Sequence, residues 1–225
     1  MEMTAAAVWL TDVFSGIDLG ILSLMHTLAE HAGAVLTPLA CLITLLGEKG
    51  IIFFLIALVL MCRSKTRPLG VCIFGAVCCG ALITNVILKD WVARPRPFET
   101  LAVYRAWWNY IGSPAEDGFS FPSGHVTAAA AGMVSLCFMR SRRWLGATVG
   151  VVLVMALSRN YLMAHYPSDV IAAAIIGTLS AYVAYLITML IFSFFAGRDK
   201  SDRLAQFVLH YDLPLPAFLT YKGKH

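Results

Sequence analysis

Long apolar segments are the feature that most constrains the fold of this 225-residue chain. A helix needs roughly 20 predominantly apolar residues to cross the hydrocarbon core of a bilayer. Four segments meet that requirement, at 69–92, 121–139, 144–162 and 167–197. The composition agrees, because 59% of the residues are hydrophobic and only 13% are charged, which is unlike a soluble domain. The sequence therefore predicts an all-α integral membrane protein, a polytopic bundle of transmembrane helices.

The region ahead of these segments is harder to divide into spans. Residues 33–62 are apolar but are interrupted by the sequence GEKG at 47–50. The part that follows the interruption, 51–62, would be only about 18 Å long as a helix, which is too short to cross a bilayer. We therefore expect one long, kinked span over 33–62, with the glycines marking a bend. The charge of Glu48 has no explanation at this stage.

The N-terminal part of the chain has the pattern of an amphipathic helix. Apolar residues recur on one helical stripe from Ile17 to Leu28, whereas Asp18, Glu30 and His31 interrupt any continuous apolar run. This pattern favours a helix that lies in the membrane interface over one that spans the bilayer.

The chain is thus expected to have three parts. They are an N-terminal interfacial helix region at 1–32, a transmembrane domain at 33–200 and a cytoplasmic tail at 201–225. The transmembrane domain is expected to contain five spans, with six as the alternative. We expect no cleavable signal peptide, because the first 48 residues contain no Lys or Arg, and such peptides begin with a positively charged region.

Basic residues indicate the orientation, because short loops rich in Lys and Arg remain in the cytoplasm. Three clusters fall on one side of the membrane if each of the four later segments is a single span: Arg63, Lys65 and Arg67; Arg140, Arg142 and Arg143; and Arg198, Lys200 and Arg203. The opposite face, with the 93–120 loop and the 163–166 turn, is then outside. We expect a multi-pass protein of the plasma (inner) membrane whose C-terminus is cytoplasmic.

Three polar clusters lie at the outer ends of the predicted spans. Ionisable groups at that depth are costly and usually face a polar cavity. Because the clusters reach the same depth from distant parts of the sequence, we expect them to form one site. They consist of Lys89, Arg94 and Arg96; Ser123, Gly124 and His125; and Arg159, His165 and Asp169.

These residue types indicate a phosphate ligand and a reaction at phosphorus. Guanidinium groups such as those of Arg96 and Arg159 bind phosphate oxygens through paired hydrogen bonds, and a helix that starts just after Pro122 offers free N–H groups to an anion. One neutral imidazole can attack phosphorus while a second, protonated, donates to the leaving oxygen. Asp169 follows His165 by four residues, so its carboxylate could accept the imidazole N–H.

The three clusters resemble the signature of the type-2 phosphatidic acid phosphatase superfamily, which includes vanadium haloperoxidases and bacterial acid phosphatases. Its motifs are K-x6-R-P, P-S-G-H and S-R-x5-H-x3-D. They are matched here by Lys89, Arg96 and Pro97; by residues 122–125; and by Ser158, Arg159, His165 and Asp169. The signature covers 89–169, and the helices around it extend the resemblance over most of 33–197.

The resemblance implies a role for each residue. His165 forms a phosphohistidine, Asp169 orients it, and His125 protonates the leaving group and later helps to activate water. Arg94 does not fit the spacing of the first motif, and it stays either a secondary contact or an interfacial charge. No metal or other cofactor is implied. The phosphoryl oxygens are expected to be bound by Lys89, Arg96, Ser123, Gly124 and Arg159.

The expected function is that of a membrane lipid phosphatase acting on a phosphomonoester or a terminal diphosphate. Polyprenyl diphosphate is ranked ahead of phosphatidate and phosphatidylglycerophosphate. The alternatives are a lipid phosphotransferase that uses the same phosphohistidine and a non-catalytic lipid-binding membrane protein. The expected partners are the lipid substrate and the bilayer, with no nucleic acid. Seven aromatic residues at 98–121 are typical of an interfacial belt, with a lid over the site as the alternative.

Overall fold

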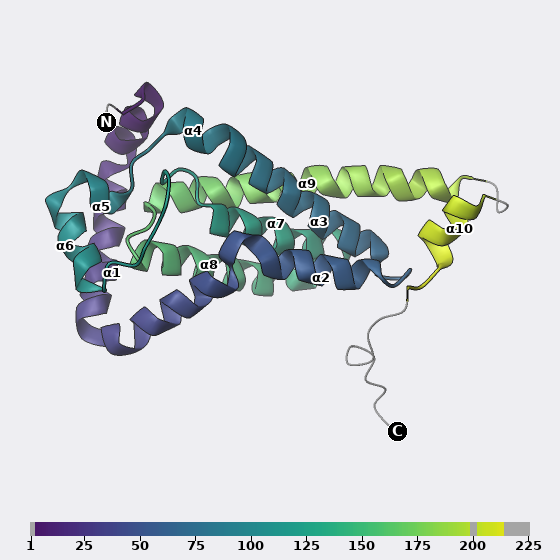
Figure 1. Ribbon diagram of the computed structural model, residues 1–225, viewed down its shortest axis with the longest axis horizontal. Helices are drawn as coiled ribbons and strands as arrows, with labels where there is room; N and C mark the ends of the chain where they lie inside the picture. Colours follow the sequence, from purple (N-terminus) through teal and green to yellow (C-terminus); the bar gives the residue numbers. More distant parts are fainter. Residues whose placement is uncertain (1–2, 199–201, 214–225) are drawn as a thin grey trace, which may run out of the picture.

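The computed structural model describes residues 3–198 and 202–213, and every regular element within them is a helix (Figure 1). The prediction of an all-α bundle is confirmed. Most of the tail predicted at 201–225 lies outside the described residues.

The bundle consists of long helices that run along the long axis of the molecule (Figure 1). Its main members are α3 (Arg67–Ala81), α7 (Gly124–Met139), α8 (Leu145–Tyr161) and α9 (Pro167–Ala196). A short 3-10 helix, η3 (Arg142–Trp144), joins α7 to α8. The bounds of α7, α8 and α9 lie within a few residues of the expected segments, and α3 reaches the end of the 69–92 segment through η2 (Leu82–Leu88) and α4 (Lys89–Val92).

Three helical stretches are long and apolar enough to cross a membrane by length and composition: Ala5–Met61, Arg67–Thr100 and Pro167–Ala196. The shorter helix Gly124–Met139 is also apolar. The number of spans, five or six, stays a prediction.

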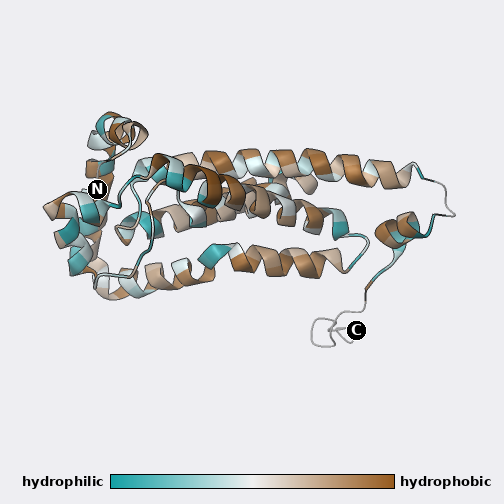
Figure 2. Ribbon diagram, turned by 45° about the horizontal axis from the view of Figure 1, so that its top comes forward, coloured by the Kyte–Doolittle hydropathy of each residue, from teal (hydrophilic) through white to brown (hydrophobic). Residues whose placement is uncertain are grey.

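Small residues allow the bundle helices to approach closely. A Cβ atom added at Gly177 of α9 would lie 2.5 Å from the carbonyl oxygen of Thr127 and 2.9 Å from the amide nitrogen of Ala131, both in α7. Large apolar side chains lie on the outside of the bundle instead; Leu190, for example, is 71% exposed. Figure 2 shows apolar residues along the length of the bundle. Close packing through small residues is typical of helices in a bilayer, where burial of apolar surface provides little driving force.

The first helix, α1 (Ala5–Leu46), changes direction near its middle. Ala32 departs from helical geometry, with φ −136° and ψ 17°. The segment before it runs across one end of the bundle, and the segment after it turns towards the other end (Figure 1). The bend coincides with the boundary expected between 1–32 and 33–62, although the position of the first segment in the membrane interface stays a prediction.

A second break separates α1 from α2 (Ile51–Met61). The short 3-10 helix η1 (Glu48–Gly50) fills it, and both Lys49 (φ 49°) and Gly50 (φ 69°) have left-handed backbone conformations. Only glycine adopts that conformation without cost. The expected bend at 47–50 is therefore present.

Two short helices, α5 (Pro97–Thr100) and α6 (Ala102–Tyr110), lie against the crosswise segment of α1 (Figure 1). The ring of Trp107 stacks on that of His26, with 5.1 Å between centroids, and Tyr104 is buried. Some of the aromatic residues at 98–121 thus pack against the N-terminal segment of α1. Their location relative to the bilayer surface stays a prediction.

The described members of the basic clusters lie at the other end of the bundle, where α2 meets α3 and where α7 and α9 end (Figure 1), and Lys200 lies outside the described residues. Here Arg67 donates hydrogen bonds to the carbonyl oxygens of Phe207 and Val208, at 2.8 and 2.7 Å, in α10 (Arg203–His210). The clusters therefore share one end, as the span pattern predicts. That this end is cytoplasmic stays a prediction.

Substitution of Gly177 tests the close contact between α7 and α9. We expect Gly177→Ala to lower the free energy of unfolding by about 1–3 kcal/mol, because the added methyl group meets backbone atoms that cannot move aside. Gly150→Ala in α8 is the matched control, since its Cβ would meet no atom within 4 Å. Thermal unfolding of both variants in detergent measures the difference, and equal effects would contradict the packing described.

Candidate active site

One cavity of about 640 Å³ gathers most of the predicted site residues. Its lining includes Lys89, Arg96, Gly124, His125, Arg159 and His165. The two remaining residues, Ser123 and Asp169, are fully buried beside it. Ser123 directly precedes Gly124, and the Asp169 carboxylate lies 4.0 Å from the His165 ring. The structure therefore brings the three clusters together, although they are widely separated in sequence.

Each cluster is positioned by the end of a helix. Lys89 begins α4 (Lys89–Val92), directly after the π-helical turn η2 (Leu82–Leu88) that continues α3. Such wide turns are rare and are often found at functional sites. Ser123 is the N-cap of α7, Arg159 lies in the last turn of α8, and His165 lies in the turn before α9.

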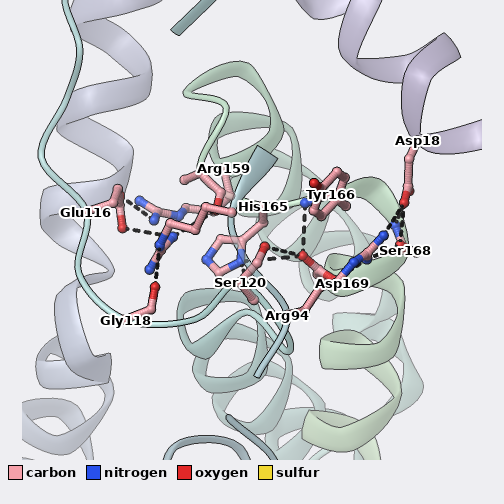
Figure 3. Close-up of polar contacts among 12 residues, drawn as sticks. Asp18, Arg94, Glu116, Gly118, Ser120, Arg159, His165, Tyr166, Ser168 and Asp169 are labelled. Carbon is pink, nitrogen blue, oxygen red and sulfur yellow. Dashed lines mark hydrogen bonds and ion pairs between the residues drawn. The ribbon is translucent and has the colours of Figure 1, made fainter. Parts of the chain in front are cut away.

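The tautomer of His165 is set by a backbone carbonyl. Its Nδ1 lies 2.6 Å from the carbonyl oxygen of Ser120, whereas the nearer oxygen of Asp169 is 4.0 Å away (Figure 3). A carbonyl oxygen can only accept a hydrogen bond, so Nδ1 donates and Nε2 keeps its lone pair. The hydrogen bond expected between His165 and Asp169 is therefore replaced by one to Ser120.

The electrostatic surroundings keep this imidazole neutral. Burial lowers the pKa of His165 well below its ordinary value, and the positive charges of Arg159 and Arg96 lower it further. A neutral ring with a free nitrogen is the form that can act as a nucleophile.

Asp169 acts on His165 through Ser120. One carboxylate oxygen accepts hydrogen bonds from the Ser120 hydroxyl and, at 3.0 Å, from the backbone N–H of Tyr166. The other accepts from Arg94 at 2.6 Å. The aspartate thus fixes the segment whose carbonyl group orients His165, and Figure 3 shows this chain of contacts.

Arg94 is a secondary contact of the site. Its guanidinium is 1% exposed and lies between two carboxylates, 2.6 Å from Asp169 and 2.9 Å from Asp18 of α1. It also donates to the Ser168 hydroxyl at 2.8 Å. The alternative of an interfacial charge, left open by the sequence, is excluded by this burial.

Asp18 was expected on the polar face of an interfacial helix, but it is 1% exposed. It accepts hydrogen bonds from the backbone N–H and the hydroxyl of Ser168, at 2.9 and 2.8 Å. The sequence contained a signal for this position: Asp18, Leu22 and Met25 are spaced as one helical stripe, and all three are buried.

Glu116 occupies the position between two guanidinium groups that a phosphate is expected to take. Its carboxylate contacts Arg159 and lies 3.3 Å from Arg96 (Figure 3). Arg96 is held from behind by the carbonyl oxygens of Gly118 and Ala164, at 2.9 and 2.8 Å. The sequence analysis did not single out Glu116.

Ser123 has a buried hydroxyl with no hydrogen-bond partner among the described residues. A buried polar group without a partner is destabilising, and Ser123 stands at the N-terminus of α7, where free N–H groups attract anions. A phosphate bound there would provide an acceptor. The cavity can therefore bind an anion and present it to a neutral histidine.

Comparisons with known proteins identify the family and the fold. The model of the family described as the PAP2 superfamily matches residues 70–192, more than half of the chain. In the solved structures, a PAP2-type phosphatidylglycerolphosphate phosphatase from Bacillus subtilis has a similar fold, with a TM-score of 0.56 and 21% identity. The similarity covers 84% of this chain and 98% of that one.

Two curated relatives are similar in sequence. An undecaprenyl-diphosphatase of Sulfolobus acidocaldarius is 26% identical over 127 residues, which is 56% of this chain and 58% of that protein. A lipid A 4'-phosphatase of Bacteroides thetaiotaomicron is 34% identical over 106 residues, 46% of each chain. The chain thus spans about half the length of the curated relatives it matches.

Removal of the Arg94 side chain tests the buried ion pairs. We expect Arg94→Ala to lower the free energy of unfolding by about 3–5 kcal/mol, because Asp18 and Asp169 are left buried without their cation. Arg105→Ala, an exposed arginine nearby, is the control. Thermal unfolding in detergent provides the measurement. A loss of stability no larger than that of the control would show that the two ion pairs of Arg94 contribute nothing to the free energy of unfolding.

Neutralisation of Glu116 tests whether its carboxylate competes with a bound anion. We expect Glu116→Gln to tighten the binding of inorganic phosphate about tenfold, or about 1.4 kcal/mol, because the anion no longer displaces a negative charge from Arg96 and Arg159. Isothermal titration calorimetry measures the affinity. Asp117→Asn removes the same charge from the cavity lining without breaking these pairs, and an equal effect there would contradict direct competition.

Proposed function

Because this chain belongs to the PAP2 superfamily, we propose that it is an integral membrane lipid phosphatase. It releases phosphate from a phosphomonoester or a terminal diphosphate carried by a lipid. The observation that carries the proposal is the cavity that two histidines line together with Lys89, Arg96 and Arg159, at one end of a bundle with an apolar exterior.

In the first step, Nε2 of His165 attacks phosphorus. The P–N bond forms as the bond to the leaving oxygen breaks, and the oxygen takes the electron pair together with a proton from His125. Lys89, Arg96 and Arg159 neutralise the phosphoryl oxygens, and the free N–H groups at the start of α7 bind them. The positive side chains of the cavity thus supply the charge neutralisation that a metal ion supplies in other phosphatases.

In the second step, water replaces His165 on phosphorus. His125 accepts a proton from the water as its oxygen bonds to phosphorus, and the P–N bond breaks. Inorganic phosphate leaves, and the His165 ring returns to its neutral form with Nδ1–H still donated to Ser120. Asp169 and Ser120 keep the ring oriented throughout.

Substrate binding requires Glu116 to leave the arginine pair. A phosphate dianion carries more charge than a carboxylate and offers more acceptor oxygens to guanidinium groups. Replacement of the Glu116 carboxylate by the phosphate of the substrate is therefore favourable. Glu116 pairs with the two arginines again when the product leaves.

We rank polyprenyl diphosphate first as the substrate, ahead of phosphatidate and phosphatidylglycerophosphate. The undecaprenyl-diphosphatase of Sulfolobus acidocaldarius supports this order, and the lipid A 4'-phosphatase adds a phosphorylated glycolipid to the candidates. The basic clusters at the end opposite the cavity support an active site at the outer face and a cytoplasmic C-terminus.

Phosphate release from a panel of lipids tests the function. Detergent-purified protein in EDTA is expected to hydrolyse one of polyprenyl diphosphate, phosphatidate, phosphatidylglycerophosphate and lipid A. We expect His165→Ala to lower kcat by about 10⁴-fold or more, as in other enzymes that lose a covalent nucleophile. His31→Ala, an exposed histidine outside the cavity, is the control and is expected to retain full activity.

The outcomes distinguish the candidate functions. Transfer of phosphate to an added alcohol, without release in water, would favour a phosphotransferase. Lipid binding that is unchanged in His165→Ala, with no turnover by the wild-type protein, would favour a non-catalytic lipid-binding protein. Activity that disappears in EDTA and returns with added metal would contradict the metal-independent mechanism.

A further inference from the structure

We propose that Glu48 is a positioning residue for the same reaction, whose carboxylate holds the proton that His125 delivers to the leaving group. The inference rests on the proposed function, because it gives His125 the role of general acid. It also accounts for a charge that neither the sequence nor the phosphate-binding arrangement explains.

The geometry places the two groups together. The Glu48 carboxylate lies 3.4 Å from Nε2 of His125, and both residues line the same cavity. The imidazole is only 15% exposed, whereas the carboxylate is 45% exposed. Within the described parts of the chain, Nε2 has no hydrogen-bond partner, and Glu48 is the acidic group within ion-pair distance of it.

The backbone of η1 is strained where it presents this carboxylate. Lys49, a residue with a Cβ atom, has a left-handed conformation, with φ 49°. Such strain persists only where the surroundings fix it, and it is frequent at functional sites. Gly50 packs against α7, where an added Cβ would lie 3.0 Å from the Cβ of Ala128. Ala128 and His125 are three residues apart and so share a face of α7.

The charges in the cavity explain why His125 needs an anion. A general acid must carry its proton before the leaving group departs, and cations nearby repel a protonated imidazole. Glu116 is already paired with two arginines, which leaves Glu48 as the carboxylate at Nε2. The other charged or titratable groups that line the cavity are Lys49, Lys89, Arg96, Arg159, His165, Glu116 and Asp117.

The proton passes through a defined sequence of positions. Before the reaction, the protonated His125 ring holds its Nε2 proton within ion-pair distance of the Glu48 carboxylate. As the P–O bond breaks and the oxygen takes the electron pair, that proton moves to the leaving oxygen and His125 becomes neutral. In the second step Nε2 accepts a proton from the attacking water, and Glu48 again stabilises the charged ring. No additional reactant is needed.

Leaving groups of different basicity test this role. Hexyl phosphate and 4-nitrophenyl phosphate carry the same phosphate, but only the alkoxide needs a proton in order to leave. We expect Glu48→Gln to lower kcat/KM for hexyl phosphate by about 10²-fold and to leave kcat/KM for 4-nitrophenyl phosphate almost unchanged. The value of kcat/KM is measured because it includes only the steps up to departure of the leaving group.

Four further variants complete the experiment. His125→Ala is expected to show the same selectivity, and the double variant to lose no more than His125→Ala alone, because the two residues act as a unit. Glu48→Asp keeps the charge and is expected to recover part of the hexyl phosphate rate. Glu30→Gln breaks a His26–Glu30 pair of 3.5 Å that lies outside the cavity, and it is expected to change neither rate.

Equal losses with both esters, no loss with either, or full additivity with His125→Ala would overturn this role for Glu48. In each of these cases an active wild-type enzyme leaves the proposed function in place. A wild-type protein that hydrolyses neither ester nor any lipid of the panel would overturn the proposed function, and this inference with it.

Discussion

The buried guanidinium of Arg94 is the interaction on which the rest of the site depends. It lies between Asp18 of α1 and Asp169 of α9, so one cation joins the crosswise N-terminal segment to the helix that carries the catalytic turn. Each of these charges would be very costly to bury alone. The N-terminal helix is therefore part of the candidate site, because without it the guanidinium of Arg94, which holds Asp169, would lose the carboxylate of Asp18 and become exposed.

The sequence predicted the elements of the site better than their contacts. Motif spacing placed eight site residues near helix ends, and six of them line one cavity. Ser120 and Glu116 were missed because their contacts are made between residues far apart in the chain, whereas the burial of Asp18 was missed although its spacing from Leu22 and Met25 indicated it. The four-residue spacing suggested a bond from His165 to Asp169, but a helix begins at Pro167. The Asp169 carboxylate therefore accepts a hydrogen bond from the backbone N–H of Tyr166 and lies too far from Nδ1 of His165 to bond to it.

Carboxylates offset part of the positive charge of the cavity even without a ligand. Clustered cations repel one another, and Glu116 offsets this repulsion for Arg96 and Arg159. Glu48 is a further carboxylate of the cavity lining, and strained backbone places it beside His125. In the proposed reaction at phosphorus, Glu116 lies where the phosphoryl oxygens would bind and Glu48 lies beside the proposed general acid. This division explains how a strongly basic pocket can exist next to an apolar bundle.

The π-helical turn at Leu82–Leu88 has a consequence for how this chain can change in length. A π-helical turn contains one more residue than an α-helical turn, so it shifts the direction of everything that follows. Deletion of a single residue there would rotate the next side chains by about 100° and turn Lys89 away from the cavity. The number of residues in this turn therefore sets the direction of Lys89 as firmly as their identity does.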